Sequence, residues 1–341
     1  NLGSGLALHA ITGYESVKTF SRGDIDGGFG ASFLPASGPG VIPFASETAD
    51  GIPKHRQLTQ ELRLESDSKG PLDWQAGVFV FAEDYRAESF SYDSLAGNVQ
   101  DGYQRIRQKN DAVAVFGNVN FAVSPQLKLR GGLRYTNDKK TLTVEAYDTT
   151  AFVPCVLSAK CTLAQLAAQE PDGKLSASPK DSKLSWDLAG TYALQKDINL
   201  YARAASGFRA SSVQSAGPFN AKSVAGAENN TSFELGMKAD LFDRRARLNI
   251  GAFSYTVKDL QLTAVGGAAN ANILLNAKKA RGRGLEMDLQ ALLSDNLMAS
   301  LGVGDNDTKI QDPNLLVAFC QQCTVTDPIV TVTTPAGPAQ R

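Results

Sequence analysis

Apolar and polar residues alternate along this chain with a period of two. In residues 127–138 ("LKLRGGLRYTND") the leucines and Tyr135 stand at odd positions, whereas the cations Lys128, Arg130 and Arg134 stand at even positions. Successive side chains of a strand point to opposite faces, so this segment predicts a strand with one apolar and one cationic face. Roughly eleven segments show the same alternation, which is too many for chance. The pattern predicts an all-β protein.

The connections between the predicted strands are of two kinds. Short ones read "DSKGP", "SPQ", "QKD", "FDRR" and "LSDN", and they predict tight antiparallel hairpins. Longer segments, rich in Gly, Pro, Ser and Ala, alternate with them and are predicted to be loops: 21–56, 86–109, 148–182, 212–229 and 305–341. Short turns at one end and long loops at the other are typical of an outer-membrane barrel. We therefore predict an antiparallel transmembrane β-barrel with its apolar strand faces in lipid.

Charged residues on the polar strand faces are then predicted to line the lumen. These residues are Arg63, Lys128, Arg130, Arg134, Arg203, Glu234, Lys238, Glu286 and Asp288. Both signs are present, so the charges have partners of opposite sign within the barrel or in something inserted into it. A wide lumen must hold water or a polar plug, because burying unpaired charge is costly.

Composition narrows the class of protein further. The chain has 34 Lys and Arg against 35 Asp and Glu, a net charge of −1, which argues against a nucleic-acid partner. No run of residues reaches the ~18 consecutive apolar positions of a membrane-spanning helix, which leaves a barrel possible. The first residues lack an initiator Met and a basic leader, and the last read as loop, so we interpret the sequence as a fragment.

Three segments resemble barrel hairpins of the TonB-dependent receptors. They are "NLYARAASGFRA" (199–210), "SFELGMKADLFDRRARLNIGAFSYTVKDLQL" (232–262) and "NAKKARGRGLEMDL" (276–289). In that family, a strand with aromatic-Ala-Arg that ends in Gly-Phe-Arg is followed by a Glu-x-Gly-x-Lys strand. A strand that ends in Lys-Asp-Leu-Gln and a strand of the Gly-x-Glu-x-Asp type come next, and this sequence has the same order. The resemblance extends from about residue 6 to 304. It implies a barrel of about 22 strands around an N-terminal plug. Residues 1–341 would be the central part of that barrel, with the plug and the C-terminal strands absent from this chain.

The resemblance also implies a function. It points to an active-transport receptor in the outer membrane of a Gram-negative cell, which captures a ferric siderophore or a similar scarce nutrient. Its expected partners are the TonB energy-coupling complex, reached through the missing plug, a small-molecule metal chelate, lipid and lipopolysaccharide, and we expect a monomer without a cofactor. Two alternatives stay open: a passive outer-membrane porin, and a soluble β-rich carbohydrate-binding domain.

Aromatic and cationic residues near the predicted barrel mouth are candidates for ligand binding. They are Tyr92, Tyr103, Arg105, Arg107, Arg209 and Phe219. Cations beside low-dielectric walls concentrate an anionic ligand, and aromatic faces supply contact area. Arg209 is the strongest candidate, because its strand pattern points it inward just below a long loop. The alternative is that these residues anchor loops or bind lipopolysaccharide phosphates.

The cysteines and histidines complete the candidate chemistry. Cys155 and Cys161 lie in one predicted long loop and Cys320 and Cys323 in another, which predicts two disulfides within loops of an exported protein. A four-thiolate zinc site is the alternative, but its Cys-x5-Cys half fits zinc spacing poorly. The two histidines lie in no recognisable nucleophile elbow. We therefore predict no enzyme and no metal site.

Overall fold

The computed structural model describes residues 5–24, 47–66, 70–93, 99–148, 173–214, 224–266, 271–315, 331–334 and 337–340. One antiparallel sheet contains most of them, in the order β1-β2-β3-β4-β5-β7-β8-β11-β12-β13-β14. Its first strands are β1 (Leu6–Asp24), β2 (Glu47–Ser66), β3 (Leu72–Asp93), β4 (Val99–Ala122) and β5 (Leu127–Asp148). Its later strands are β7 (Lys180–Gln195), β8 (Ile198–Arg209), β11 (Glu228–Leu241), β12 (Ala246–Gly266), β13 (Ala271–Ser294) and β14 (Leu297–Ile310).

Five short strands lie beside this path. β6 (Gly173–Ala177) pairs with the outer part of β5. β9 (Ser212–Val213) pairs with β10 (Val224–Ala225), and β15 (Thr331–Thr334) pairs with β16 (Gly337–Gln340). The predicted all-β, antiparallel architecture is confirmed. The described part of the chain contains no helix long and apolar enough to cross a membrane.

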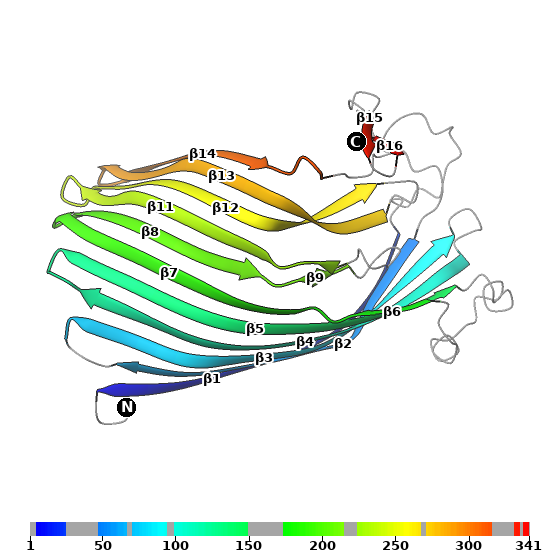
Figure 1. Cartoon of the computed structure of the whole chain (residues 1–341). Helices are drawn as coiled ribbons and strands as arrows, with labels where there is room; N and C mark the ends of the chain where they lie inside the picture. The colour runs from blue at the N-terminus through cyan, green and yellow to red at the C-terminus, as the bar shows by residue number, and fades with distance from the viewer. Residues whose placement is uncertain are drawn as a thin grey trace.

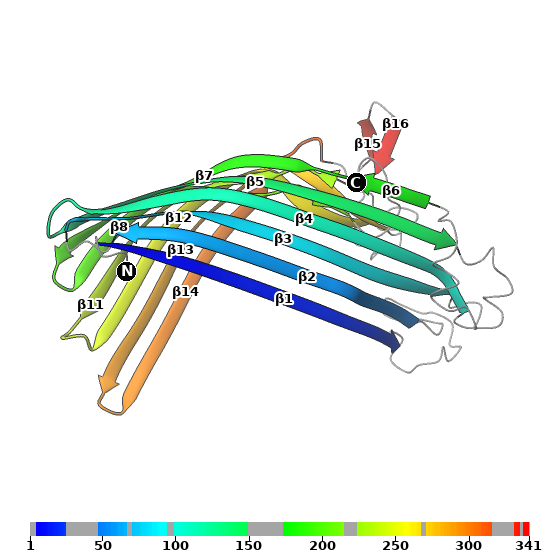
Figure 2. The same ribbon diagram turned by 90° about the horizontal axis from the view of Figure 1, so that it is seen from below.

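The sheet is strongly curved and forms an open trough, part of a barrel, with β1 and β14 at its two ends (Figures 1 and 2). The short connections β4–β5, β7–β8, β11–β12 and β13–β14 lie at one end of the strands, on the left in Figure 1. In the connection between β11 and β12, Phe242, Asp243 and Arg244 have φ of 53°, 53° and 66°. Tight turns between twisted antiparallel strands often need such positive φ values.

Side chains of opposite character occupy the two faces of the sheet. On β5, Leu129, Leu133 and Tyr135 are 41%, 60% and 52% exposed and lie on the convex face. The even positions of the same strand lie on the concave face, where Thr136 and Asp138 are buried and Lys128 and Arg130 are exposed. Since the register pairs like positions with like across each hairpin, the apolar residues join into one band around the convex face.

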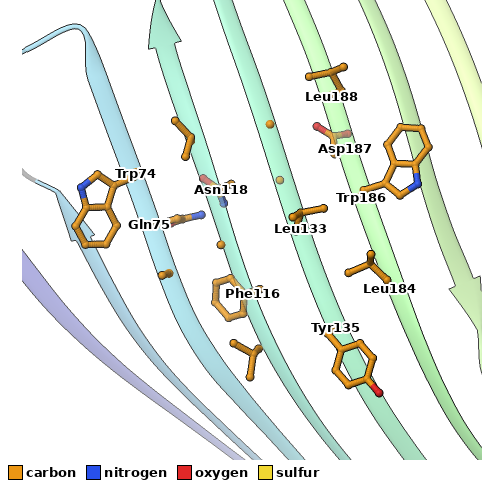
Figure 3. A pocket seen from close by; sticks show the side chains of 16 residues that line it. Trp74, Gln75, Phe116, Asn118, Leu133, Tyr135, Leu184, Trp186, Asp187 and Leu188 are labelled. Atoms are coloured by element: carbon orange, nitrogen blue, oxygen red, sulfur yellow. The ribbon is translucent and has the colours of Figure 1, made fainter.

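The apolar band contains a groove between β3 and β7, where glycines replace larger side chains. Gly117 and Gly131 lie on the convex face and leave a groove of about 980 Å³. Trp74 and Trp186 stand on its two sides, with Leu133 between them (Figure 3). Its lining is mostly apolar, so it belongs to the outer band and not to the polar interior.

The strands are longer than the sequence pattern predicted. Residues 86–109 were predicted to be a loop, but β3 continues to Asp93 and β4 begins at Val99. The segment from 305 likewise begins as strand, because β14 ends at Ile310. Alternation of apolar and polar residues stops at the edge of the apolar band, whereas backbone hydrogen bonding between strands continues beyond it.

Candidate functional site

The concave face carries the charged residues that the sequence analysis assigned to a lumen. By register, all nine lie on the face opposite the apolar band: Arg63, Lys128, Arg130, Arg134, Arg203, Glu234, Lys238, Glu286 and Asp288. Period-two alternation within each strand places them there.

Some of these charges have partners on neighbouring strands. Asp187 on β7 accepts a hydrogen bond from Nε of Arg203 at 2.6 Å, and Nε of Arg130 lies 3.7 Å from its other oxygen. Tyr201 donates its hydroxyl to Glu234 at 2.6 Å, and Nζ of Lys238 lies 5.7 Å from the centre of the Tyr201 ring. These contacts compensate part of the charge on the concave face within the sheet.

Both histidines form hydrogen bonds with carboxylates on the concave face. His9 and Glu65 form a hydrogen bond of 2.7 Å between β1 and β2. His55 and Glu83 form one of 3.0 Å between β2 and β3, and Gln108 donates to the second oxygen of Glu83 at 3.2 Å. Among the described residues no group of three or more His, Cys, Asp and Glu side chains is placed to hold a metal ion.

A small hairpin formed by β9 and β10 reaches over the concave face at the end opposite the short turns. Val213 on β9 packs against a buried cluster of Ile106, Leu142 and Val144, which are 7%, 1% and 3% exposed. These three residues belong to β4 and β5, although Val213 follows β8 in the chain. The hairpin therefore narrows the mouth of the trough.

Gln261 on β12 anchors this hairpin. Its side-chain nitrogen donates to the carbonyls of Ala210 at 2.9 Å and Gly226 at 3.0 Å, and its side-chain oxygen accepts from Ser212 at 2.6 Å. Its backbone N–H donates to Glu228 at 2.7 Å. Gln261 is 7% exposed, so all its polar groups obtain partners within the protein.

Asn276 on β13 provides the second anchor. Its oxygen accepts from the Gly226 amide at 2.7 Å, and its nitrogen donates to the carbonyls of Gly226 at 2.9 Å and Asp259 at 2.6 Å. The sequence analysis missed both anchors. An isolated Gln or Asn at a strand end resembles any solvated polar residue, and only its long-range partners distinguish it.

Arg209 lies at the base of this hairpin. It is the last residue of β8 and lies on the concave face. Its cross-strand neighbour is Glu228, whose carboxylate accepts the hydrogen bond from the backbone N–H of Gln261. Its side chain is exposed. Among the predicted ligand-binding residues whose side chains the structure describes, Arg209 is the one that lies on the concave face beside the mouth.

Three other predicted binding residues lie on the opposite, convex face. Tyr103, Arg105 and Arg107 share the face of Val113 and Val115 on β4, so the structure does not bring them together with Arg209. Tyr103 is 3% exposed and donates to Glu88 at 2.8 Å. Arg105 binds Glu145 through two nitrogens at 2.9 and 2.7 Å.

The remaining candidates lie outside the described residues. Tyr92 belongs to β3, where its backbone pairs with Gln100, but its side chain is not described. Phe219 and the cysteines Cys155, Cys161, Cys320 and Cys323 also lie outside the described part. Their roles stay predictions.

Comparison with known families agrees with this architecture. The profile of the family described as "TonB dependent receptor-like, beta-barrel" matches residues 2–316. The chain therefore belongs to the TonB-dependent receptor family and forms part of its barrel domain. No sequence among curated proteins matches the chain.

Solved structures show the same fold at low sequence identity. The ferric yersiniabactin uptake receptor FyuA from Yersinia pestis is 16% identical, with a TM-score of 0.61 over 79% of this chain and 39% of that one. The siderophore receptor PiuA from Acinetobacter baumannii is 13% identical, with a TM-score of 0.62 over 96% and 47%. The copper transporter OprC is 16% identical, with a TM-score of 0.62 over 92% and 45%. The chain thus spans less than half the length of these three proteins.

Proposed function

We propose that this chain is the central part of the barrel of an outer-membrane receptor that takes up a metal chelate, such as a ferric siderophore, by TonB-dependent active transport. The missing strands and an N-terminal plug would complete the barrel, and the plug would contact the TonB complex. The observation that carries the proposal is the two-faced sheet, with an apolar convex band and a charged, partly ion-paired concave lining in one curved wall. Membership of the receptor family supports active transport.

The narrowed mouth favours a receptor over a passive pore. The β9–β10 hairpin is fixed to β12 and β13 by Gln261 and Asn276 and to β4 and β5 by the contacts of Val213. A hairpin fixed on both sides restricts the path along the concave face. Such a constriction suits a ligand that is first bound and then released, not one that diffuses freely.

The proposed ligand class rests on the similar solved structures and on the position of Arg209. Two similar structures are siderophore or ferric-chelate receptors and a third is a copper transporter, by their names. Arg209 presents an exposed guanidinium at the mouth, and such a cation attracts a carboxylate or catecholate chelate. Metal chelates with negative charge are therefore the ligands we propose.

The test is uptake of labelled ferric chelates by cells that carry the full-length receptor, with and without a working energy-coupling complex. We expect uptake only in the energised cells. Uptake that persists without coupling would support the passive porin instead. Energised uptake of a ligand that contains no metal would support active transport by a receptor but contradict the proposed metal-chelate ligand.

A pair of arginine variants tests the binding face. Arg209→Gln, on the concave face, should weaken chelate binding, whereas Arg107→Gln removes an exposed arginine from the convex face and should not. Binding of the labelled chelate to whole cells at low temperature measures affinity separately from transport. If the two variants bound the chelate with equal affinity, Arg209 would not belong to the chelate-binding site.

A further inference from the structure

Two aromatic residues of β12 lie flat on the concave face of the sheet, against the backbone of β13. Phe253 pairs with Glu234 of the concave lining on one side and lies directly opposite Gly284 on the other. Tyr255 lies directly opposite Gly282. A Cβ atom at Gly284 would clash with the Phe253 ring, and one at Gly282 would clash with the Tyr255 ring. Each ring therefore covers a glycine, and a larger residue at either position would lift the ring off the sheet.

The two rings form one flat surface. Their planes differ by 14°, and their centres lie 6.2 Å apart. The glycines beneath them are separated by roughly 6.6 Å along β13, at ~3.3 Å per residue, so the rings lie side by side and not one above the other. Both side chains are half-buried, because the sheet covers one face of each ring. The other two faces form an aromatic platform, Phe253 and Tyr255, that is open to the interior of the trough.

Polar groups border this aromatic platform on its β14 side. The hydroxyls of Tyr255 and Thr308 form a hydrogen bond of 3.0 Å, and Thr308 donates to the side-chain oxygen of Asn306 at 3.1 Å. Both β14 residues are exposed. Within the described part of the chain, the side-chain nitrogen of Asn306 donates to no other group. This edge of the platform therefore offers a ligand both hydrogen-bond donors and acceptors.

Two carboxylates extend the site along β13 towards the short turns. Glu286 and Asp288 follow Gly284 at alternate positions of the concave face, and both are exposed. Among the described residues, neither side chain has an ion-pair or hydrogen-bond partner. Gly304 is the cross-strand neighbour of Glu286, and a Cβ atom there would meet no atom within 4 Å. Open space therefore adjoins a carboxylate that is free to accept hydrogen bonds from a ligand.

The charges and polar groups around the platform distinguish between ligands. An anionic ring would be repelled by Glu286 and Asp288. A cation would use the carboxylates and the ring faces but not the donor of Asn306. An uncharged sugar ring uses all of them, because its hydroxyls both donate and accept hydrogen bonds. Its C–H groups carry a small positive charge and are attracted to the negative faces of aromatic rings.

We propose that the aromatic platform and the polar groups beside it bind an uncharged pyranose sugar ring. The C–H face of the sugar packs on Phe253 and Tyr255. Its hydroxyls donate to the carboxylates of Glu286 and Asp288, and one of them accepts from Asn306.

The platform lies further inside the trough than the mouth hairpin. From Tyr255 to Gln261, the anchor of that hairpin, β12 extends roughly 20 Å at ~3.3 Å per residue. A sugar that reaches the platform has therefore passed the mouth, either as a free saccharide or as a group attached to the metal chelate. This inference rests on the proposed passage of a ligand along the concave face, but it does not require that the ligand contain a metal.

The first test is binding of maltotriose, cellotriose and chitotriose to the full-length receptor, in a detergent without a sugar headgroup. Irradiation of the aromatic protons of the protein should transfer magnetisation to the C–H protons of a bound sugar, and calorimetry gives its affinity. Phe253→Leu/Tyr255→Leu should weaken binding about tenfold, roughly threefold for each ring. The matched control is Phe79→Leu/Phe81→Leu, which changes two aromatic residues at the same spacing on the concave face of β3. The control should bind as the wild type does.

The carboxylates are tested by a variant that changes little volume. Glu286→Gln should weaken sugar binding about fivefold, because a hydrogen bond to a charged acceptor is stronger than one to a neutral acceptor. Asp73→Asn is the matched control, since Asp73 is an exposed carboxylate at the short-turn end of β3. Heat-modifiable mobility shows which variants assemble. If the double leucine variant does not assemble, Glu286→Gln decides the outcome.

A second experiment distinguishes the two sources of the sugar. It compares a ferric tris-catecholate that carries glucosyl groups with the same chelate without them. Tighter binding of the glucosylated chelate, lost in Phe253→Leu/Tyr255→Leu, would show that the sugar arrives on the chelate. Binding of the oligosaccharides alone would show that it arrives free. If neither chelate binds, the proposed chelate transport fails, and the oligosaccharide titration still decides whether the platform binds sugar.

Three results would overturn the proposal. The first is that none of the three oligosaccharides binds, as expected if the plug covers the two rings. The second is that binding is unchanged in Phe253→Leu/Tyr255→Leu and in Glu286→Gln, or weakened equally in their matched controls. The third is that tetramethylammonium binds more tightly than the sugars and displaces them, which would indicate a site for organic cations.

Discussion

The guanidinium carbon of Arg134 lies 5.2 Å from the centre of the Phe79 ring, on the concave side of the sheet. The Phe116 ring lies 5.8 Å away, and Nε of Arg134 donates to Thr136 at 3.1 Å. The negative faces of the two aromatic rings attract the cation, and this attraction stabilises Arg134 without a carboxylate partner. The preceding residue, Leu133, is 60% exposed on the other face.

This neighbouring pair allows a test of the two faces. Leu133→Arg in the full-length protein should impair membrane assembly, because an arginine on the lipid face near the bilayer centre costs ~2–4 kcal/mol. Arg134→Leu should assemble, because its neighbours Phe79 and Phe116 accept an apolar side chain. Heat-modifiable mobility of outer-membrane fractions measures assembly. Failure of Arg134→Leu together with success of Leu133→Arg would reverse the face assignment.

Loss of the Gln261 side chain should release the mouth hairpin. Gln261→Leu removes a hydrogen-bond donor from the carbonyls of Ala210 and Gly226. Gly226 keeps the donor from Asn276, so the local cost is about 1–3 kcal/mol for the Ala210 carbonyl. Hydrogen exchange at Val213 and Val224 should become faster, while exchange in β5 stays unchanged. Gln290→Leu, an exposed position on β13, is the matched control. Unaltered exchange in Gln261→Leu would show that other contacts hold the hairpin.

The four cysteines should form the bridges Cys155–Cys161 and Cys320–Cys323. An oxidising compartment and close spacing within each loop favour these pairs. Peptide mapping of the intact receptor without reductant should yield two peptides that each contain an internal bridge. Free thiols, or pairing between the two loops around bound zinc, would contradict the prediction.

Asp312, beyond the end of β14, should give the adjoining turn a dependence on pH. Its carboxylate accepts the backbone amides of Lys278 at 2.8 Å and Asn314 at 3.0 Å, and these bonds hold the pKa of Asp312 below its ordinary value. The group therefore stabilises the turn above the unfolded pKa of about 3.9, and this stabilisation is lost as the pH falls further. Exchange of the Lys278 amide, corrected for its intrinsic pH dependence, should accelerate on acidification. Asp312→Asn should abolish that acid effect, and an identical pH profile in both proteins would exclude Asp312 as its origin.

The sequence by itself determined the class of architecture and the side-chain faces. A strand turns each successive residue to the other face, so the order Leu133, Arg134, Tyr135 already separates an apolar surface from a polar one. Short connections such as "QKD" and "FDRR" permit only hairpins, which made the sheet antiparallel. Both properties depend on neighbours within a few residues, and so they can be inferred without long-range contacts.

Only the tertiary structure decided where the strands end and which distant residues meet. β3 and β4 continue through residues that the pattern assigned to a loop, because backbone pairing needs no alternation of side chains. Arg105 and Arg209 resemble each other in sequence, yet they lie on opposite faces of the sheet. Gln261 reaches Ala210 and Gly226, which lie 51 and 35 residues earlier in the chain. Such partners are set by the curvature and register of the whole sheet, which no local pattern contains.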